Sequence, residues 1–257
     1  MVERRVGFAN RPLLLQQARA RMTRTLIDGV QIDMSTEECK KLLRRHIYTK
    51  TNLLIMFVDI NNSTEMSLSL QENKLALVLQ SFAQEISIAI SGYGGYVFKY
   101  EGDAVIALFP AEYDNVKACK NALDCSRAIS TIIKEVINPA FKVNELPEIT
   151  VRTGLAYGYA LVVLYGKGME SSHIDIIGSS ISLAAKIASI AKPNQILIGE
   201  SIYNIFKSSS STAATHNNFL NYDSSSFREI NLDPTKWKYL SRSDPESMYR
   251  VYEYLEN

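Results

Sequence analysis

The stretch Leu53-Leu54-Ile55-Met56-Phe57-Val58-Asp59-Ile60 decides the fold, because it is an apolar run interrupted only by one carboxylate near its end. A short apolar run of this kind predicts a buried central strand. The polar turn Asn61-Asn62-Ser63-Thr64 follows directly. Asp59 therefore closes a buried strand beside a polar loop, which makes it the first candidate site residue.

The segments that follow alternate between strand and helix patterns. Apolar residues recur at helical spacing in two long segments, and glycines end the first of them. In chain order we expect a helix over Glu65–Ser91, strands over Tyr96–Tyr100 and Asp103–Phe109 joined by Glu101-Gly102, a helix over Asn115–Ile137, a strand over Ile149–Leu164, a short helix over Ser179–Ala191 and a strand over Gln195–Ile198. The order β-α-β-β-α-β predicts an α+β, ferredoxin-like domain with an antiparallel sheet and helices on one face.

The N-terminal segment differs in charge from the rest. Residues 1–50 hold eight Arg and three Lys against five acids, so their net charge is 11 − 5 = +6. Helices are predicted over Leu13–Ile27 and Cys39–Ile47. We interpret residues 1–50 as a helical lead-in that packs on a domain over 51–257. The alternatives are a regulatory or oligomerisation arm and a patch for an acidic partner.

The C-terminal part contains little regular pattern. Ser201–Phe206 is predicted to form a last helical turn. Residues 208–226 are rich in Ser, Asn and Thr, which predicts a surface loop. Residues 248–255 alternate aromatic and polar side chains, which predicts a closing strand.

Composition excludes several classes of function. The chain has 257 residues with 28 basic and 27 acidic side chains, so it has no charge footprint for general nucleic-acid binding. The longest apolar run has six residues, whereas a membrane span needs about 20. We see no secretory signal. Three cysteines without a CxxC pair predict reduced thiols in a cytoplasmic protein.

Asp59 and Asp103 stand at strand ends that a β-α-β-β unit places side by side. Asp103 follows the tight Glu101-Gly102 turn, and the end of the first strand lies beside that hairpin. Two converging carboxylates suit Mg²⁺, which commonly binds one or two carboxylates together with substrate phosphates. The alternative is that each aspartate caps a turn.

Several blocks in sequence resemble the catalytic domain of class III nucleotidyl cyclases. They cover about residues 52–206 and occur in the family's order. They are Phe57-Val58-Asp59-Ile60 continuing to Thr64 (F-x-D-I-x-x-x-T), Lys99 to Ala104 (K-x-x-G-D-A), Arg152 to Gly158 (R-x-G-x-x-x-G), Asp175 to Lys186 (D-x-x-G-x-x-V-N-x-A-x-R) and Pro193 to Ile198.

This resemblance implies a metal-dependent reaction at the interface of a homodimer. Asp59 and Asp103 would hold two Mg²⁺ or Mn²⁺ ions per site, assisted by the Ile60 carbonyl, and Thr64 would contact the substrate. The ribose 3′-hydroxyl of a nucleoside triphosphate would attack the α-phosphorus, which yields a 3′,5′-cyclic nucleotide and pyrophosphate.

Lys99 and Asp175 match the family's base-selecting pair, supplied by the partner protomer. A Lys donor and an Asp acceptor suit the ring nitrogen and exocyclic amine of adenine, so ATP is the expected substrate. The resemblance also implies a basic residue on the triphosphate from a late hairpin. Lys236, Lys238 and Arg242 are the candidates, and a solvated basic loop is the alternative.

The sequence departs from the family at its transition-state pair. Ser182 and Lys186 stand where the family has Asn and Arg four residues apart on one helix face. Ser has a shorter reach than Asn, and Lys lacks the planar fork of Arg. The alternatives are therefore a degenerate cyclase-like nucleotide-binding or regulatory protein, and a cyclase for GTP or a pyrimidine triphosphate. A diguanylate cyclase is disfavoured because its Gly-Gly-Asp/Glu-Glu-Phe signature is absent.

Overall fold

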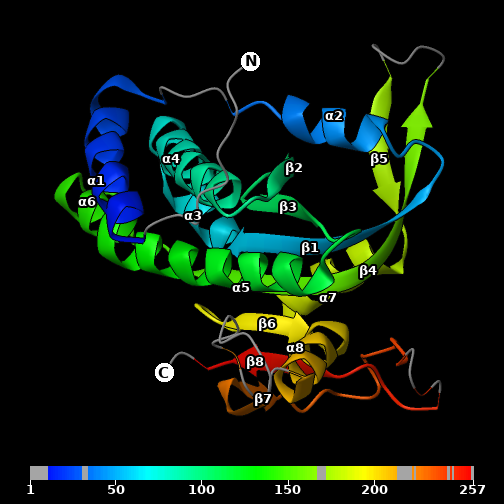
Figure 1. The fold of residues 1–257 in the computed structure, drawn as a ribbon. Helices are drawn as coiled ribbons and strands as arrows, with labels where there is room; N and C mark the ends of the chain where they lie inside the picture. The colour runs from blue at the N-terminus through cyan, green and yellow to red at the C-terminus, as the bar shows by residue number, and fades with distance from the viewer. Residues whose placement is uncertain are drawn as a thin grey trace.

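The computed structural model describes residues 11–30, 34–166, 172–212, 222, 224–241, 244 and 246–255. Its strands form one sheet in the order β2-β3-β1-β4-β6-β8-β7, and β5 pairs with β4 outside that path (Figure 1). The strands are β1 (Lys50–Ile60), β2 (Tyr96–Glu101), β3 (Ala104–Pro110), β4 (Val151–Tyr165), β5 (His173–Ile177), β6 (Ile196–Gly199), β7 (Phe227–Glu229) and β8 (Val251–Tyr254). The helices are α1 (Arg11–Asp28), α2 (Glu37–Arg44), α3 (Ser63–Ser69), α4 (Glu72–Gly92), α5 (Asn115–Ile132), η1 (Ile133–Ile137), α6 (Asn138–Val143), α7 (Ser179–Ile190), α8 (Glu200–Thr212) and η2 (Ser224–Ser226).

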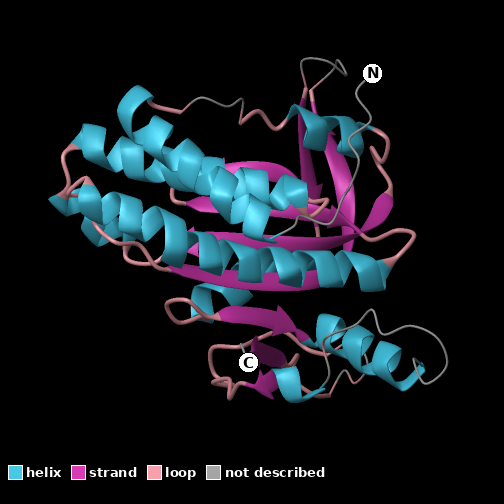
Figure 2. Cartoon of the chain, turned by 60° about the vertical axis from the view of Figure 1, so that its left-hand side comes forward, coloured by secondary structure: helices cyan, strands magenta, loops and turns pink. Residues whose placement is uncertain are grey.

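The predicted central strand is β1, which pairs antiparallel with β3 on one side and β4 on the other. Its side chains alternate between two cores. Leu54 and Met56 lie in the core that includes α4 and α5, whereas Leu53 and Ile55 lie in the core that includes α2 and α7. The long helices run along the sheet (Figure 2). The α+β fold class is confirmed, but helices pack on both faces of the sheet rather than on one.

Two of the expected helices differ from the prediction. The expected helix over Glu65–Ser91 is broken into α3 and α4, because Leu70 and Gln71 are extended with ψ of 149° and 144°. The helix expected over Asn115–Ile137 continues through a π-helical turn, η1, into α6. Pro139 explains that turn, since it lacks an amide N–H and its ring would clash with the carbonyl four residues earlier.

The sequence pattern missed β5 and misjudged the segment after β6. Residues 208–212 belong to α8 rather than to a loop, so the prediction of a surface loop is wrong there. Residues 213–221 lie outside the described residues. Tyr222 is buried and donates a hydrogen bond to the carboxylate of Asp124 on α5. The expected closing strand is shorter than predicted, as β8, and pairs with β6 and β7.

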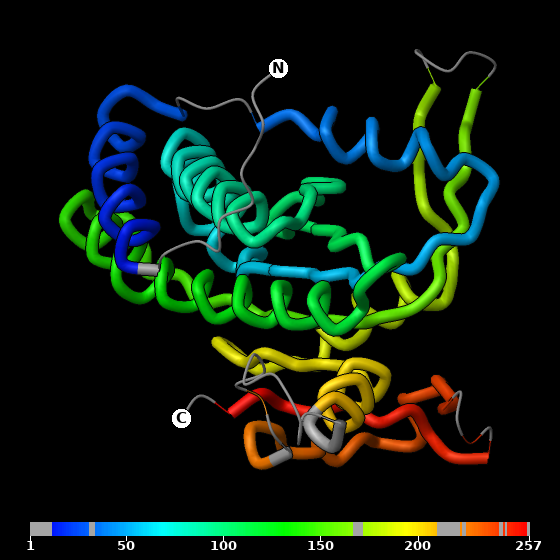
Figure 3. Tube along the Cα trace, viewed as in Figure 1, coloured from blue at the N-terminus to red at the C-terminus, as the bar shows by residue number. Residues whose placement is uncertain are grey.

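The N-terminal helix α1 packs against α4, α5 and η1 (Figure 3). Its residues Leu14, Ala18 and Met22 are buried in the core. Arg21 donates to both carboxylate oxygens of Glu85 on α4, at 3.1 and 2.7 Å, and the Glu85 side chain has no exposed surface. The lead-in helix is therefore fixed to the domain by apolar packing and by a charge pair that is buried on one side.

We expect Arg21→Ala to destabilise the fold by about 3–5 kcal/mol, because it leaves the buried Glu85 carboxylate without its cation. Chemical denaturation measures this change in the free energy of unfolding. Arg24→Ala, on an exposed position of the same helix, should change it by less than about 0.5 kcal/mol. Adding Glu85→Gln to Arg21→Ala should recover most of the loss. Equal effects of the two arginine variants would contradict this assignment.

Among the described residues, α4 is long and apolar enough to cross a membrane by length and composition. Half of its apolar window is buried inside the protein, so this feature is weak evidence for a membrane span. The cysteines are free and buried, in agreement with the prediction of reduced thiols. Burial raises the pKa of the Cys39 thiol to about 12, which keeps it protonated and unreactive.

Candidate active site

The strands bring Asp59 and Asp103 together at one end of the sheet. Asp59 lies opposite Ala104 in β3, and the Ile60 amide donates to the Asp103 carbonyl at 3.3 Å. Asp103 follows Gly102, whose φ of +61° suits glycine in this two-residue turn. The Asp103 carboxyl lies within hydrogen-bonding reach of Asp59. The juxtaposition predicted from the strand order is thus present, while the roles of both residues stay a prediction.

The environment of Asp59 disfavours a negative charge. Burial raises the pKa of Asp59 to about 6, helped by the neighbouring Asp103 carboxyl and opposed by the Arg152 guanidinium. Such a pair gains stability when a cation screens both carboxylates, which fits a divalent metal ion. The described residues contain no group of three or more His, Cys, Asp or Glu side chains suited to a metal. Further oxygen ligands would come from the Ile60 carbonyl, substrate phosphates and water.

Asp59 gives the metal-free protein a testable pH dependence. Its folded pKa of about 6 exceeds the ordinary 3.8, so the folded state retains a proton that the unfolded chain releases between these values. The titration of Asp59 therefore lowers the free energy of unfolding as the pH rises from about 4 to about 6. We expect Asp59→Asn to become increasingly more stable than the parent across that range, and the difference to level off above it. Thermal unfolding at matched ionic strength measures it, and a constant difference would contradict the shift.

Arg152 is a site residue that motif reading did not single out for a role. It lies opposite Asp59 in the β1–β4 register and donates from Nη2 to the Asp59 carboxylate. Its Nε is buried and has no hydrogen-bond partner among the described residues. With Asn61, Ser63 and Thr64 it lines a hollow of about 490 Å³ at the end of the sheet. Thr64, expected to contact substrate, is exposed there.

Asp59, Asp103 and Arg152 form the first group of candidate site residues, and Lys99 and Asp175 form a second. Lys99 Nζ lies 2.7 Å from Asp175 Oδ2, although 76 positions separate them in sequence. A register shift between Val97 and Lys99 re-aims the lysine side chain. Asp175 stands in β5 and also accepts from the Ile176 amide at 2.8 Å. Both side chains are about one-quarter exposed, so a ligand has access to them.

Ser182 and Lys186 form a third group, on α7. Ser182 is exposed and Lys186 half-buried, and neither side chain bonds to another residue in the described part of the chain. Gly154 in β4 sets the close approach of α7, because a Cβ there would overlap the backbone of Ala188. Ser180 Oγ adds a hydrogen bond to the Tyr159 carbonyl at 2.7 Å.

The three basic residues expected to contact the triphosphate lie between β7 and β8 in the sequence. Lys236 is 81% exposed and lies 3.8 Å from Asp233. Trp237 is buried and donates to the Tyr249 carbonyl at 2.9 Å, which fixes the segment to the core. Lys238 is exposed, and Arg242 lies outside the described residues. Lys236 and Lys238 do not line the hollow at Arg152.

The profile of the adenylate and guanylate cyclase catalytic domain matches residues 46–222. The chain belongs to this family. The resemblance drawn from the motifs is therefore confirmed. The lead-in helix α1 lies before the matched range.

Curated relatives share the cyclase region but differ in the base they are named for. A cytidylate cyclase of Staphylococcus aureus is 27% identical over 150 residues, which cover 57% of this chain and 36% of the relative. A uridylate cyclase of Rhodovulum sp. (strain MB263) is 30% identical over 144 residues, which cover 52% and 57%. The chain thus spans about one-third to just over half of these relatives' length.

A solved structure agrees with the fold. The adenylyl cyclase CyaB from P. aeruginosa has a TM-score of 0.63 and is 21% identical, covering 81% of this chain and 96% of that one. At this identity the similarity supports the fold alone. The nucleotide that this chain uses therefore has to be argued from its own side chains.

Proposed function

We propose that this protein is a nucleoside triphosphate cyclase that converts ATP to 3′,5′-cyclic AMP and pyrophosphate. The observation that carries the proposal is the Asp59–Asp103 pair with Arg152 at its edge. Two neighbouring carboxylates, of which Asp59 has a pKa raised by burial, fit Mg²⁺ or Mn²⁺, which when bound stabilises the attacking and leaving oxygens of the displacement. The Arg152 guanidinium has the planar fork that binds phosphate oxygens.

The Lys99–Asp175 pair supports a substrate whose base carries an exocyclic amine. Asp175 would accept from that amine, and Lys99 would donate to the adjacent ring nitrogen. Adenine and cytosine both offer this edge, whereas guanine and uracil offer an oxo group instead. ATP is the substrate expected from the family's pair. CTP is the second candidate, favoured by the shared edge and by the name of the Staphylococcus aureus relative.

A homodimer would complete the site, because no hydrogen bond or ion pair joins the three groups of side chains to one another within the part of one chain that the structure describes. Tyr165 and Ile177 are exposed by 57% and 45% on the β4–β5 arm that carries Asp175, and Tyr159 is exposed by 53% just before that arm begins. This arm projects from the body of the molecule (Figure 1). Exposed apolar side chains on such an arm suit a protein contact. Activity that rises with protein concentration and follows the dimer fraction would support this arrangement.

The test of the function is product formation from ATP, GTP, CTP and UTP with Mg²⁺ or Mn²⁺, read by mass spectrometry. We expect cyclic AMP, with cyclic CMP as the next product. A cyclic nucleotide with an oxo base would overturn the base assignment. Tight ATP binding without any product, from a folded dimer, would instead favour the degenerate, nucleotide-binding alternative.

Lys186 offers a test by gain of function. We expect Lys186→Arg to raise kcat about tenfold or more, because a guanidinium adds a second hydrogen bond to the charge that develops on phosphate. Ser182→Asn should add to this effect. The measurement is the initial rate at saturating ATP and metal ion. Lys192→Arg, an exposed position just beyond α7, is the matched control and should leave the rate unchanged. No increase in the Lys186 variant would remove Lys186 from the reaction.

A further inference from the structure

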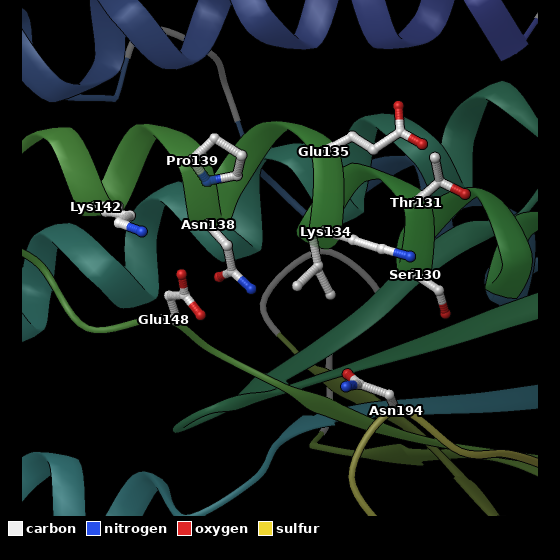
Figure 4. A pocket seen from close by; sticks show the side chains of 10 residues that line it. Ser130, Thr131, Lys134, Glu135, Asn138, Pro139, Lys142, Glu148 and Asn194 are labelled. Carbon is white, nitrogen blue, oxygen red and sulfur yellow. The ribbon is translucent and has the colours of Figure 1, made fainter.

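A cavity lies away from the Asp59–Asp103 pair, between the helix α5–η1–α6 and the start of β4. Its volume is about 760 Å³. Figure 4 shows side chains from both sides directed toward the same space. Lys134, Asn138 and Lys142 come from the helix, while Glu148 and Asn194 come from the two connections that face it. Ile133 and Pro139 add an apolar wall.

Ser130, Thr131 and Asn138 of this cavity already donate to backbone carbonyls, whereas three other donor groups that line it are free. In the part of the chain that the structure describes, Lys134 and Lys142 make no ion pair or hydrogen bond through their ammonium groups, and the Asn194 Nδ2 has no acceptor. Two carboxylates are also present. Glu135 is engaged by Arg19 of α1 at 3.5 Å, and Glu148 is unpaired at the rim. Two free ammonium groups and a free amide thus face one free carboxylate, so the cavity favours an anion.

The cavity walls also hold the strand that carries Arg152. Both amide atoms of Asn138 bond to the backbone of Ile149, at 2.9 Å each. The backbone N–H of Asn194 donates to the Val151 carbonyl at 2.7 Å, and the side-chain Oδ1 of Asn194 accepts from the Val151 backbone N–H at 3.4 Å. The next residue, Arg152, reaches Asp59. A ligand that moves Asn194 therefore also moves the backbone of Val151, which precedes Arg152 of the candidate active site.

We propose that this cavity is a second ligand site, which binds a small molecule with a phosphate or carboxylate group. Lys134, Lys142 and the Asn194 amide hold the anion, and Ile133 with Pro139 packs against the apolar part. The π-helical turn at η1 contributes, because its wider winding shapes the wall at which Lys134 stands; such turns are frequent at functional sites. Binding of the ligand shifts the backbone of residues 149–151 and thereby changes the position of the Arg152 side chain.

The test is a titration of metal-free, full-length protein, followed by ¹H–¹⁵N NMR, with inorganic phosphate in one arm and succinate in the other. Sodium chloride at matched ionic strength is the reference. We expect saturable shifts of the Asn194 side-chain amide and of the Thr150 and Val151 backbone amides. The arm that gives tighter binding identifies the anion. The readout needs neither substrate nor metal, so it stands independently of the proposed cyclase activity.

Three variants decide where the anion sits. Lys134→Glu with Lys142→Glu should weaken binding about tenfold or more, since each lost charge-assisted hydrogen bond is worth roughly a factor of ten. Lys117→Glu with Lys207→Glu makes the same change of charge at exposed helix positions and should leave binding unchanged. Arg152→Met should also retain binding. The proposal is overturned by no saturable shift in the parent, by equal loss in both lysine pairs, or by loss only in Arg152→Met, which would place the anion at the active-site hollow.

Discussion

Replacing Asp103 with alanine should lower cyclic nucleotide formation by at least about 10³-fold. The two carboxylates are the described side chains that fit a divalent cation, and a bound metal ion contributes several kcal/mol to stabilising the transition state. Asp59 cannot compensate, because it is bonded to Arg152 and supplies only one of the two carboxylates. The measurement is kcat with saturating ATP and Mg²⁺, together with a titration of Mn²⁺ binding.

The fold should survive this change. Asp103→Ala removes the carboxyl that helps to raise the pKa of Asp59, so the metal-free protein should be no less stable than the parent. Glu101→Ala is the matched control, since Glu101 is an exposed carboxylate two positions earlier in the same hairpin. It should retain activity and Mn²⁺ binding. A folded Asp103→Ala protein that keeps its rate would remove the carboxylate pair from the reaction.

The parts of this site that sequence predicts are those carried by local pattern. Asp59 was found because an apolar run ends at it, and Asp103 because a Gly turn precedes it. Lys99 and Asp175 were matched through motifs, and they do form an ion pair across 76 positions. Arg152 begins the R-x-G-x-x-x-G motif, but the motif does not indicate its contact with Asp59, which depends on the β1–β4 register and is visible only when the strands are paired.

The fold differs from the prediction where tertiary contacts override local signals. Nothing at Leu70-Gln71 resembles a helix stop, yet both residues are extended. Strand β5 has five residues with a central aspartate, so it lacks the apolar run of a buried strand, and among the described strands it pairs with β4. The end of α8 is rich in serine, which predicts a loop, but apolar positions such as Ile202 and Phe206 pack the helix into the core.

Exchanging Lys99 and Asp175 should invert the choice of base. In the parent, the lysine donor and aspartate acceptor match the amino bases adenine and cytosine. With Lys99→Glu and Asp175→Lys together, the acceptor and donor trade places, which matches the ring N–H and oxo group of guanine and uracil. Each mismatched charge-assisted hydrogen bond costs about 1.5–3 kcal/mol. The ratio of kcat/KM for ATP over GTP should therefore fall by roughly 10²–10⁴, and the ratio for CTP over UTP should fall with it.

The single changes separate base reading from damage to the fold. Lys99→Glu alone places two carboxylates together and should lower both stability and activity on every nucleotide, whereas the double variant regains an ion pair and with it the thermal stability. Reversing the exposed Glu37–Lys40 pair on α2 makes the same exchange of charge elsewhere and should leave base choice unchanged. If the double variant is stable and active but still prefers ATP, then Lys99 and Asp175 hold β2 to β5 without contacting the base. Selection would then have to come from other residues of the site.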